Sequence, residues 1–430
     1  MNYQKLWKNA EKIIPGGNGL LSKRPKRFLP NGKWPTYYKK AKGIYLWTLD
    51  NKKFIDFSIM GIGTAILGYS NSEIDKKVKK AIDNGVNTTL NCLEEYDLAK
   101  EILKHDKFAQ QVKFAKGGGE AMSIAIRIAR SNSNKYKIIF SGYHGWHDWY
   151  ISANLSNKKN LNNHLLKNLK PLGVPHNLKN SIIPLKFNDH NQLIKLFNEN
   201  KDANILVIEG ARNDYPSKKF VETINKLQKK KKIILIIDEI TSGWRECLGG
   251  VYKKLNLKPD IVVYGKAMGN GFPISAIVGK RKIMEKSNES FMSSTAWTER
   301  VGFVAALETI KFMKKNKVPS VIQKRGKKII DGWKFIAKKH KLKIKTNNFY
   351  SMPTFNFDYS KKNEILHTLF TQYMLTEGYI STNYMFVTYA HKDVEIRKYL
   401  KMCDKVFTRI KKNLIQKKVL QKTISRKMTY

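Results

Sequence analysis

The 430-residue chain has few cysteines, few acidic residues and no long apolar run. Its three cysteines lie far apart without a CxxC pair, so the sequence indicates neither a disulfide framework nor a thiolate metal site. No apolar stretch approaches the roughly 18 residues that a membrane span needs. The N-terminus also lacks the apolar segment of a signal peptide. We therefore expect a cytoplasmic globular protein with no metal and no membrane partner.

Acidic residues are scarce: 34 Asp and Glu stand against 81 Lys and Arg, a formal net charge of +47. Basic surfaces bind nucleic acid by releasing counterions, so a nucleic-acid-binding protein is one hypothesis. Only twelve of the basic residues are Arg, however, whereas recognition of bases and phosphates favours the guanidinium group. The lysines are spread along the chain, including a basic tail from Arg409 to Tyr430. We interpret them as solvated surface residues and expect no nucleic-acid partner, while a preference for small anionic partners stays open.

The order of strand-like and helix-like segments predicts an α/β protein with more than one domain. Residues 1–68 combine a short helix, a Pro-Gly-Gly break and two strands, and we assign them to a smaller domain. From 69 to 315, apolar strands alternate with helical patterns, which is typical of a mostly parallel sheet with helices on both faces. Residues 316–430 mix helices with short strands and predict a small α+β domain that ends in the basic tail. The stretch 156–186, rich in Asn and Lys, is predicted to be an irregular insertion.

The most informative residues are two charges at predicted strand ends. Asp238 closes the apolar run 233–237, and Lys266 follows the run 261–265. Ligands of open α/β sheets bind outside the carboxyl ends of the strands, so both groups are expected to point into one crevice. A pyridoxal 5′-phosphate (PLP) ring needs both, because its aldehyde condenses with a lysine amine and a carboxylate keeps its ring nitrogen protonated. A buried Asp-Lys ion pair is the alternative that the spacing leaves open.

Other strand ends carry polar or aromatic groups to the same region. Glu209 follows one apolar strand, and Tyr143 and His144 follow another. Upstream, Gly117–Gly119 lies between a predicted strand and a predicted helix. Glycines let the backbone approach an anion closely, and a helix N-terminus offers free N–H groups and a positive dipole end. The triplet therefore predicts a phosphate site, although tight turns use the same residues.

These segments resemble those of the class III PLP-dependent aminotransferases of fold type I, which include the glutamate-1-semialdehyde aminomutases. Residues 237–245 are similar to the family's Asp-Glu segment. Residues 259–273, with Gly-Lys-Ala-Met-Gly at their centre, are similar to its Schiff-base segment. The similarity extends over nearly the whole chain. It implies an α/β fold with a large PLP-binding domain built on a mostly parallel sheet and a smaller α+β domain.

The resemblance also implies roles for individual residues. Lys266 would form the internal aldimine with PLP and act as general base, while Asp238 would bind the pyridine nitrogen. The remaining cofactor-binding residues that it implies are Gly118, Gly119, Tyr143, Ile240 and Thr295, to which we add His144 and Glu209 from their places after strand ends. Of these, Ile240 and Tyr143 would cover the two faces of the ring. Thr295 corresponds to a threonine that reaches the phosphate from the other subunit, so we expect a homodimer with shared sites and dimer contacts from the N-terminal segment.

Departures from the family pattern bear on the activity. Gly117–Gly119 stands where the family has Ser-Gly-Thr, which removes two hydroxyl donors to the phosphate. Glu299 and Arg300 replace Asn-Pro, and Arg300 is a candidate either for an anionic substrate group or for a structural salt bridge. The aminomutases have an acid upstream of an Ala-His pair, whereas the stretch before Ala390 and His391 has none. We expect an aminotransferase acting on a small-molecule amino donor and a carbonyl acceptor. The alternatives are an aminomutase and a nucleic-acid-binding protein on an aminotransferase fold.

Overall fold

The computed structural model describes residues 2–30 and 32–416. They form two compact units: a central unit, Ser72–Pro319, and a terminal unit that contains the described residues on either side of it. Within the described ranges, no helix is long and apolar enough to cross a membrane, and no group of three or more His, Cys, Asp or Glu side chains could hold a metal ion. Of the predicted basic tail, residues 409–416 belong to a helix and the rest lies outside the described residues.

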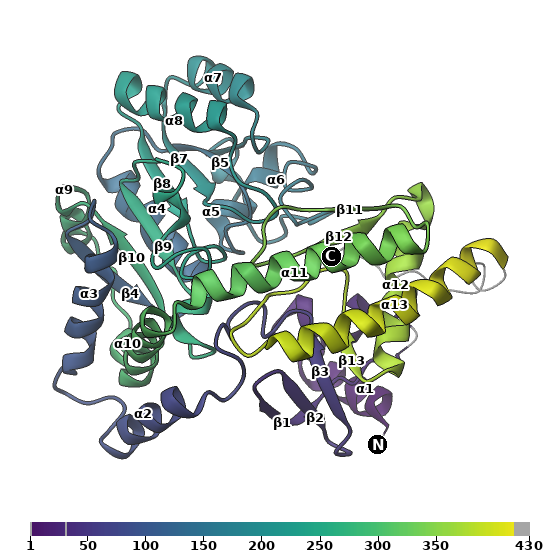
Figure 1. Ribbon diagram of the computed structural model, residues 1–430. Coiled ribbons are helices and arrows are strands. Elements are labelled where there is room, and N and C mark those ends of the chain that lie inside the picture. The colour runs from purple at the N-terminus through teal and green to yellow at the C-terminus, as the bar shows by residue number, and fades with distance from the viewer. Residues whose placement is uncertain (1, 31, 417–430) are drawn as a thin grey trace. The chain divides into compact units, whose positions relative to one another are not determined.

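The central unit is built on a seven-stranded sheet (Figure 1). From one edge to the other its strands are β4 (Gln111–Ala115), β10 (Ser275–Gly279), β9 (Ile261–Tyr264), β8 (Ile234–Asp238), β7 (Ala203–Glu209), β5 (Lys137–Ser141) and β6 (Ile182–Pro184). Strand β10 pairs antiparallel with both neighbours, and the pairs from β9 to β6 are parallel. β8 and β9 are buried along their whole length, which explains why their sequences are continuous apolar runs. The prediction of a mostly parallel sheet is confirmed.

Strand β6 corrects one expectation, because it lies within the stretch 156–186 that was predicted to be irregular. It pairs parallel with β5 at the edge of the sheet. The sequence gives little sign of it, since three residues are too few to show a periodicity and the strand ends in Pro184. Proline is tolerated there because an edge strand can leave an N–H position unpaired. The rest of the stretch begins with the last residue of a short α-helix and continues as turns and irregular segments with one short 3-10 helix.

Helices pack on the central sheet and on one another. The apolar face of α4 contributes Ala121, Met122, Ala125 and Ile128 to a core that includes residues of β5, β7, β8 and β9. α10 packs against α2 and α3, and α7 packs against α8. The helices of this unit are α2 (Ser72–Asp83), α3 (Leu93–His105), α4 (Gly118–Ser131), α5 (Asp148–Ile151), α6 (Ala153–Ser156), α7 (His190–Glu199), α8 (Lys218–Lys231), α9 (Arg281–Met284) and α10 (Arg300–Lys315).

The terminal unit joins the two ends of the described chain in one sheet of order β1-β2-β3-β13. Its last strand pairs parallel with β3, although more than 300 residues separate them. A turn joins β2 and β3, with Asn51 at φ 61°, a conformation that asparagine tolerates. The elements are β1 (Tyr38–Lys42), β2 (Tyr45–Thr48), β3 (Lys53–Phe57), β11 (Ile344–Thr346), β12 (Phe355–Phe357), β13 (Tyr379–Ser381), α1 (Tyr3–Ile13), α11 (Val318–Lys339), α12 (Asn363–Thr376) and α13 (Asp393–Gln416).

Candidate active site

The parallel strands of the central sheet bring the predicted site residues to one edge. In the register of β7 and β8, Glu209 lies directly beside Asp238. Asp238 in turn pairs with Val263 of β9, three residues before Lys266. Ser141, the last residue of β5, pairs with Ile208 of β7. The carboxyl ends of four neighbouring strands therefore carry Tyr143 and His144, Glu209, Asp238 and Lys266, as the rule for open α/β sheets requires.

Asp238 is a buried carboxylate held by two hydrogen-bond partners. Its side chain is 5% exposed. One oxygen, Oδ2, lies 2.9 Å from His144 Nδ1, and the other, Oδ1, accepts a hydrogen bond from the backbone N–H of Ile240 at 3.0 Å. The second ring nitrogen of His144 lies 3.3 Å from the carbonyl oxygen of Ser141, which fixes the imidazole from its other side. These contacts place His144 directly behind the carboxylate, where it orients Asp238.

Lys266 is in an unusual backbone conformation and an unusual electrostatic setting. It begins a short 3-10 helix with φ 41°, a value that is uncommon for residues other than glycine. Its Nζ lies 2.9 Å from Thr241 Oγ1. Burial, followed by the nearby guanidinium of Arg212, lowers the pKa of Lys266 from 10.5 to about 8. At pH 7 about one tenth of the amine is then neutral, which makes it a far better nucleophile than an exposed lysine.

Arg212 and Thr241 also belong to the site, and the sequence analysis missed both. The Nε of Arg212 lies 2.7 and 2.9 Å from the two carboxylate oxygens of Glu209, and Arg212 Nη2 also contacts Glu209 Oε1. The guanidinium centre is 5.8 Å from the centre of the Tyr143 ring, and Nη2 is 3.4 Å from Thr241 Oγ1. Both residues follow a strand end by three positions, outside any periodic segment. The only signal in the sequence was an arginine three residues after the strand-end glutamate.

The glycine triplet forms the N-terminus of α4. The first N–H groups of a helix have no partner within it, so they remain available to an anion. A methyl carbon added at Gly118 would lie 3.0 Å from Ile240 Cδ1, and one added at Gly119 would lie 3.1 Å from His147. Gly145, at φ 106°, approaches the triplet so closely that an added carbon would lie 2.9 Å from Gly119 Cα. Close packing against backbone and a positive φ thus require glycine at Gly145, while Gly118 and Gly119 are tightly packed against side chains, with Ile240 against the helix N-terminus.

The segment around Thr295 is tied to the glycine triplet. Thr295 is exposed and begins a 3-10 helix, Thr295–Thr298. Trp297 Nε1 donates to Glu120 Oε1 at 2.9 Å, while Glu120 Oε2 accepts from the backbone N–H of Gly117 at 3.1 Å. Lys116, immediately before the triplet, places its Nζ 2.7 Å from Glu299 Oε2. An ion pair between residues 183 positions apart thus connects the two segments that are predicted to bind the phosphate.

The two residues that replace the family's Asn-Pro are both part of ion pairs. Glu299 caps α10, accepting from the N–H groups of Val301 and Gly302 in addition to binding Lys116. Arg300 makes two hydrogen bonds to the Glu94 carboxylate, at 3.1 and 2.7 Å. Of the two interpretations of Arg300, the structure therefore supports the structural salt bridge.

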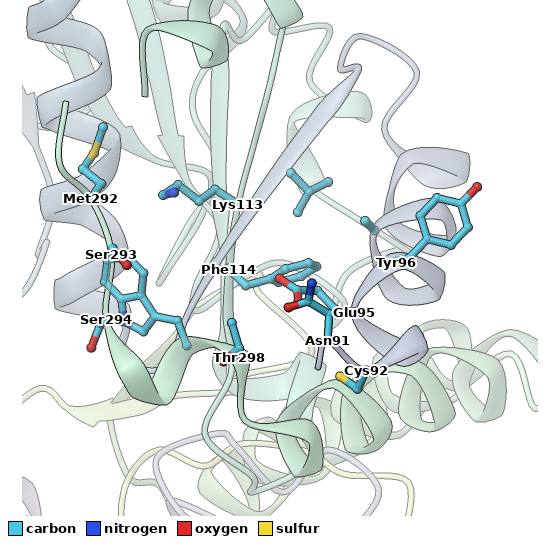
Figure 2. A pocket seen from close by; sticks show the side chains of 13 residues that line it. Asn91, Cys92, Glu95, Tyr96, Lys113, Phe114, Met292, Ser293, Ser294 and Thr298 are labelled. Atoms are coloured by element: carbon cyan, nitrogen blue, oxygen red, sulfur yellow. The ribbon is translucent and has the colours of Figure 1, made fainter. Parts of the chain in front are cut away.

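A pocket of about 460 Å³ lies beside this segment (Figure 2). Residues 292–294 and Thr298 form one side of it, and Cys92 and Tyr96 lie on the other. Lys113 and Phe114 of β4 line it between them. Large apolar side chains are exposed in the same two segments, at Leu90, Leu93, Tyr96 and Phe291. An apolar, hollowed surface of this kind is typical of a protein interface.

The residues present fit PLP in three respects. A lysine with a lowered pKa can bind its aldehyde, a buried carboxylate held by histidine can bind its ring nitrogen, and a helix N-terminus lined by glycines can bind its phosphate. Among the residues that the structure describes, Lys266 Nζ forms its hydrogen bond with the Thr241 hydroxyl and not with a carboxylate. The arrangement therefore favours a cofactor site over the alternative of a buried Asp-Lys ion pair.

Comparisons with known proteins agree with this chemistry. A family model described as class-III aminotransferase matches residues 29–407. A 3-aminobutyryl-CoA aminotransferase from Cloacimonas acidaminovorans is 32% identical over 332 residues, 75% of each chain. A glutamate-1-semialdehyde 2,1-aminomutase from Francisella tularensis is 30% identical over 94% of this chain and 98% of its own length.

Solved structures show the same fold. The PLP internal aldimine form of the FumI protein from Sphingopyxis sp. MTA144 has a TM-score of 0.87 at 22% identity and covers 96% of this chain and 97% of its own. An omega-transaminase from Sphaerobacter thermophilus has a TM-score of 0.83 at 20% identity and covers 95% of this chain and 97% of its own. The predicted fold, PLP-dependent transferase fold type I, is confirmed.

Proposed function

Because the chain belongs to the class III aminotransferase family, and is therefore a PLP-dependent enzyme that transfers amino groups between small molecules, we propose that Lys266 and Asp238 are its catalytic pair. When bound, PLP supplies an electrophilic aldehyde and a ring that accepts electrons from the substrate carbon. Lys266 binds the aldehyde through Nζ and, once released, moves a proton at the substrate carbon. Asp238 holds the proton on the ring nitrogen, and His144 orients Asp238. The observation that carries this proposal is the lowered pKa of Lys266, which lies two residues after the end of β9, the strand that pairs with β8 and Asp238.

The other site residues follow from the same placement. We propose that the backbone N–H groups of Gly118 and Gly119 bind the phosphate, and that Ile240 and Tyr143 cover the two ring faces. Ile240 is well placed for this because it lies against Gly118, and its N–H is bonded to the Asp238 carboxylate. In domain terms, residues 69–315 form the PLP-binding domain, while 1–68 and 316–430 form the smaller one.

We further propose a homodimer in which Thr295 completes the partner's phosphate site. Two observations support it: Thr295 is exposed, and large apolar side chains are exposed in the segments that line the pocket beside it. Glu209 and its partner Arg212 belong to the same subunit as Lys266. Mixing two inactive variants, Lys266→Ala and Thr295→Asp, tests the sharing.

In this mixing experiment each hybrid dimer has one site with both substitutions and one site with neither. Random exchange of subunits should therefore restore about one quarter of the wild-type activity, because half of the dimers are hybrids with one intact site. Light scattering measures the dimer itself. If Thr295 serves its own subunit, no hybrid has an intact site and the mixture stays inactive, which contradicts the proposal.

For the reaction, we propose transfer between two substrates in preference to rearrangement of one. The stretch before Ala390 and His391 lacks the acid that the aminomutases have there. An aminomutase is the second candidate, because this chain is similar to the Francisella aminomutase over 94% of its length.

Purified holoenzyme should lose its visible PLP absorption with an amino donor alone and regain it with a carbonyl acceptor. The names of the relatives suggest 3-aminobutyryl-CoA and glutamate-1-semialdehyde as first compounds to assay. Formation of 5-aminolevulinate from glutamate-1-semialdehyde, with no other amino donor present, would overturn the preference.

Two further expectations concern partners and location. We propose that the basic surface serves no nucleic acid, because many of its lysines are exposed on helix surfaces rather than gathered with arginines. Duplex DNA should therefore bind only weakly and lose affinity steeply as salt rises, while turnover persists. Tight binding at physiological salt would contradict this.

We also propose a cytoplasmic enzyme, since its three cysteines are free thiols.

A further inference from the structure

Thr241 Oγ1 lies within hydrogen-bond distance of two groups that ordinarily carry positive charge. Lys266 Nζ is 2.9 Å away, and Arg212 Nη2 is 3.4 Å away on another side. A threonine hydroxyl offers one proton and two lone pairs, so it can serve both neighbours. Arginine cannot release its proton within a protein, whereas lysine can. Of the two cations that share this oxygen, Lys266 is therefore the one that can become neutral.

We propose that Arg212 is a positioning residue that shifts the Lys266 amine toward its neutral form and, through the shared Thr241 hydroxyl, directs it toward the cofactor. This inference rests on the proposed function of Lys266. With a neutral amine, Thr241 accepts a hydrogen bond from Arg212 and either donates its own proton to the amine or accepts one of the amine's. With a charged amine, two cationic donors share one oxygen and repel each other. The closeness of the two charges thus favours the neutral amine, which is the state that can attack an aldehyde or take a proton from a substrate carbon.

The other charged groups around Lys266 act in both directions. Asp238 and Glu209 favour the charged amine, whereas Arg212 and Arg245 favour the neutral one. After burial, Arg212 is the largest influence on the pKa of Lys266, ahead of Asp238. Arg212 is paired with Glu209 through Nε and Nη2, and the same Nη2 lies 3.4 Å from Thr241 Oγ1, the oxygen that contacts Lys266. Arg212 therefore contacts both the Glu209 carboxylate, which holds it in place, and the Thr241 hydroxyl, which lies beside Lys266.

Substitutions of Arg212 and Glu209 separate the effect of charge from the effect of packing. Arg212→Gln removes the cation and leaves Glu209 unpaired, so the pKa of Lys266 should rise by about one to three units, the usual effect of changing a charge at this range. Glu209→Gln keeps the cation, and the pKa should fall. The double variant should lie between the two and above the wild type, because the influence of Arg212 exceeds that of Glu209. Arg212→Lys restores the charge and should return the pKa most of the way to its wild-type value.

The pKa of Lys266 can be measured on the apoenzyme by competitive labelling with acetic anhydride across a pH series, with the Lys266 peptide quantified by mass spectrometry. The rate constant for PLP capture by apoenzyme should show the same shift in its acid limb. Thr241→Val, compared with Thr241→Ser, should slow PLP capture at high pH with a smaller change in the pKa, since it removes the directing hydroxyl and keeps both charges. Circular dichroism reports whether each variant folds.

The outcomes distinguish this inference from the proposed function. If Arg212→Gln leaves the labelling pKa unchanged or lowers it, the inference is wrong even when PLP is still found on Lys266. If Arg212→Gln does not fold, the double variant Arg212→Gln/Glu209→Gln decides instead, because a pKa of Lys266 at or below the wild-type value in that variant overturns the inference. If PLP is found on another lysine, the proposed function fails, while the labelling pKa of Lys266 still reports the effect of Arg212.

Discussion

His391 should make the terminal unit sensitive to acid. Its imidazole is fully buried, with Nε2 2.8 Å from the carbonyl oxygen of Asp56 and Nδ1 accepting a hydrogen bond from the N–H of Thr388 at 3.0 Å. Nε2 therefore carries the proton, and protonating Nδ1 would set two donors against each other. Burial, with the nearby Arg325 charge, lowers the pKa of His391 from 6.5 to about 4.

The sign of the effect follows from where the proton binds. As pH falls from 6.5 to 4, the unfolded chain takes up a proton at this histidine and the folded chain does not, so acid favours the unfolded state. A pKa difference of about 2.5 units, at 1.36 kcal/mol per unit, corresponds to about 3 kcal/mol of unfolding free energy lost over this range. For a domain of 150–250 residues this amounts to a lowering of Tm by roughly 6–12 °C.

Comparison with His391→Gln isolates this contribution, because the glutamine amide can still donate to Asp56 but does not titrate. At pH 7 the variant should be less stable than the wild type, and the gap in Tm should narrow by roughly 6–12 °C as pH falls to 4. His164, whose pKa burial lowers to about 4 as well, is present in both proteins and cancels in the difference. Thermal unfolding of the two holoenzymes across the pH series measures the gap. A gap that stays constant to within 2 °C would refute the reasoning.

Three further substitutions test the site. Asp238→Asn keeps the shape of the carboxylate but cannot hold the ring proton, so single-turnover proton abstraction should slow by about a hundredfold or more while PLP still binds; near-normal rates would refute the role. Gly145→Ala should weaken PLP affinity in a cofactor titration, because the added carbon would press on the glycine triplet. Gly173 also has a positive φ but has open space around it, so Gly173→Ala should leave the affinity unchanged. Equal effects of the two substitutions would contradict the packing argument. Glu299→Gln removes the ion pair that joins the triplet to the Thr295 segment and should speed PLP loss on dialysis, while Glu308→Gln, which removes an exposed ion pair on the same helix, should leave it unchanged.

The sequence was sufficient for the parts of the fold that are built on continuous apolar runs. Such runs mark β7, β8 and β9, and their strand ends place Glu209, Asp238 and Lys266 at one edge without further information. The short edge strand β6 lacked a recognisable pattern. Local sequence therefore predicted which residues lie together at this edge of the sheet.

It did not predict how those residues are held there. The contact of His144 with Asp238 joins residues 94 positions apart, and that of Lys116 with Glu299 joins residues 183 apart. No periodicity or motif encodes such pairs, because they depend on how the loops fold over the sheet. For the same reason the sequence left two interpretations of Arg300 open, and its distance from Glu94 decided between them.

The central claim is that Lys266, among the many lysines of this basic chain, is the residue that binds PLP. Borohydride reduction of the yellow holoenzyme, followed by proteolysis and peptide mass spectrometry, tests it directly. We predict that the reduced cofactor is found on the peptide that contains Lys266, and that Lys266→Ala folds, gives no such adduct and has no turnover. A stoichiometric adduct on any other lysine, or a Lys266→Ala variant that still turns over, would contradict the account.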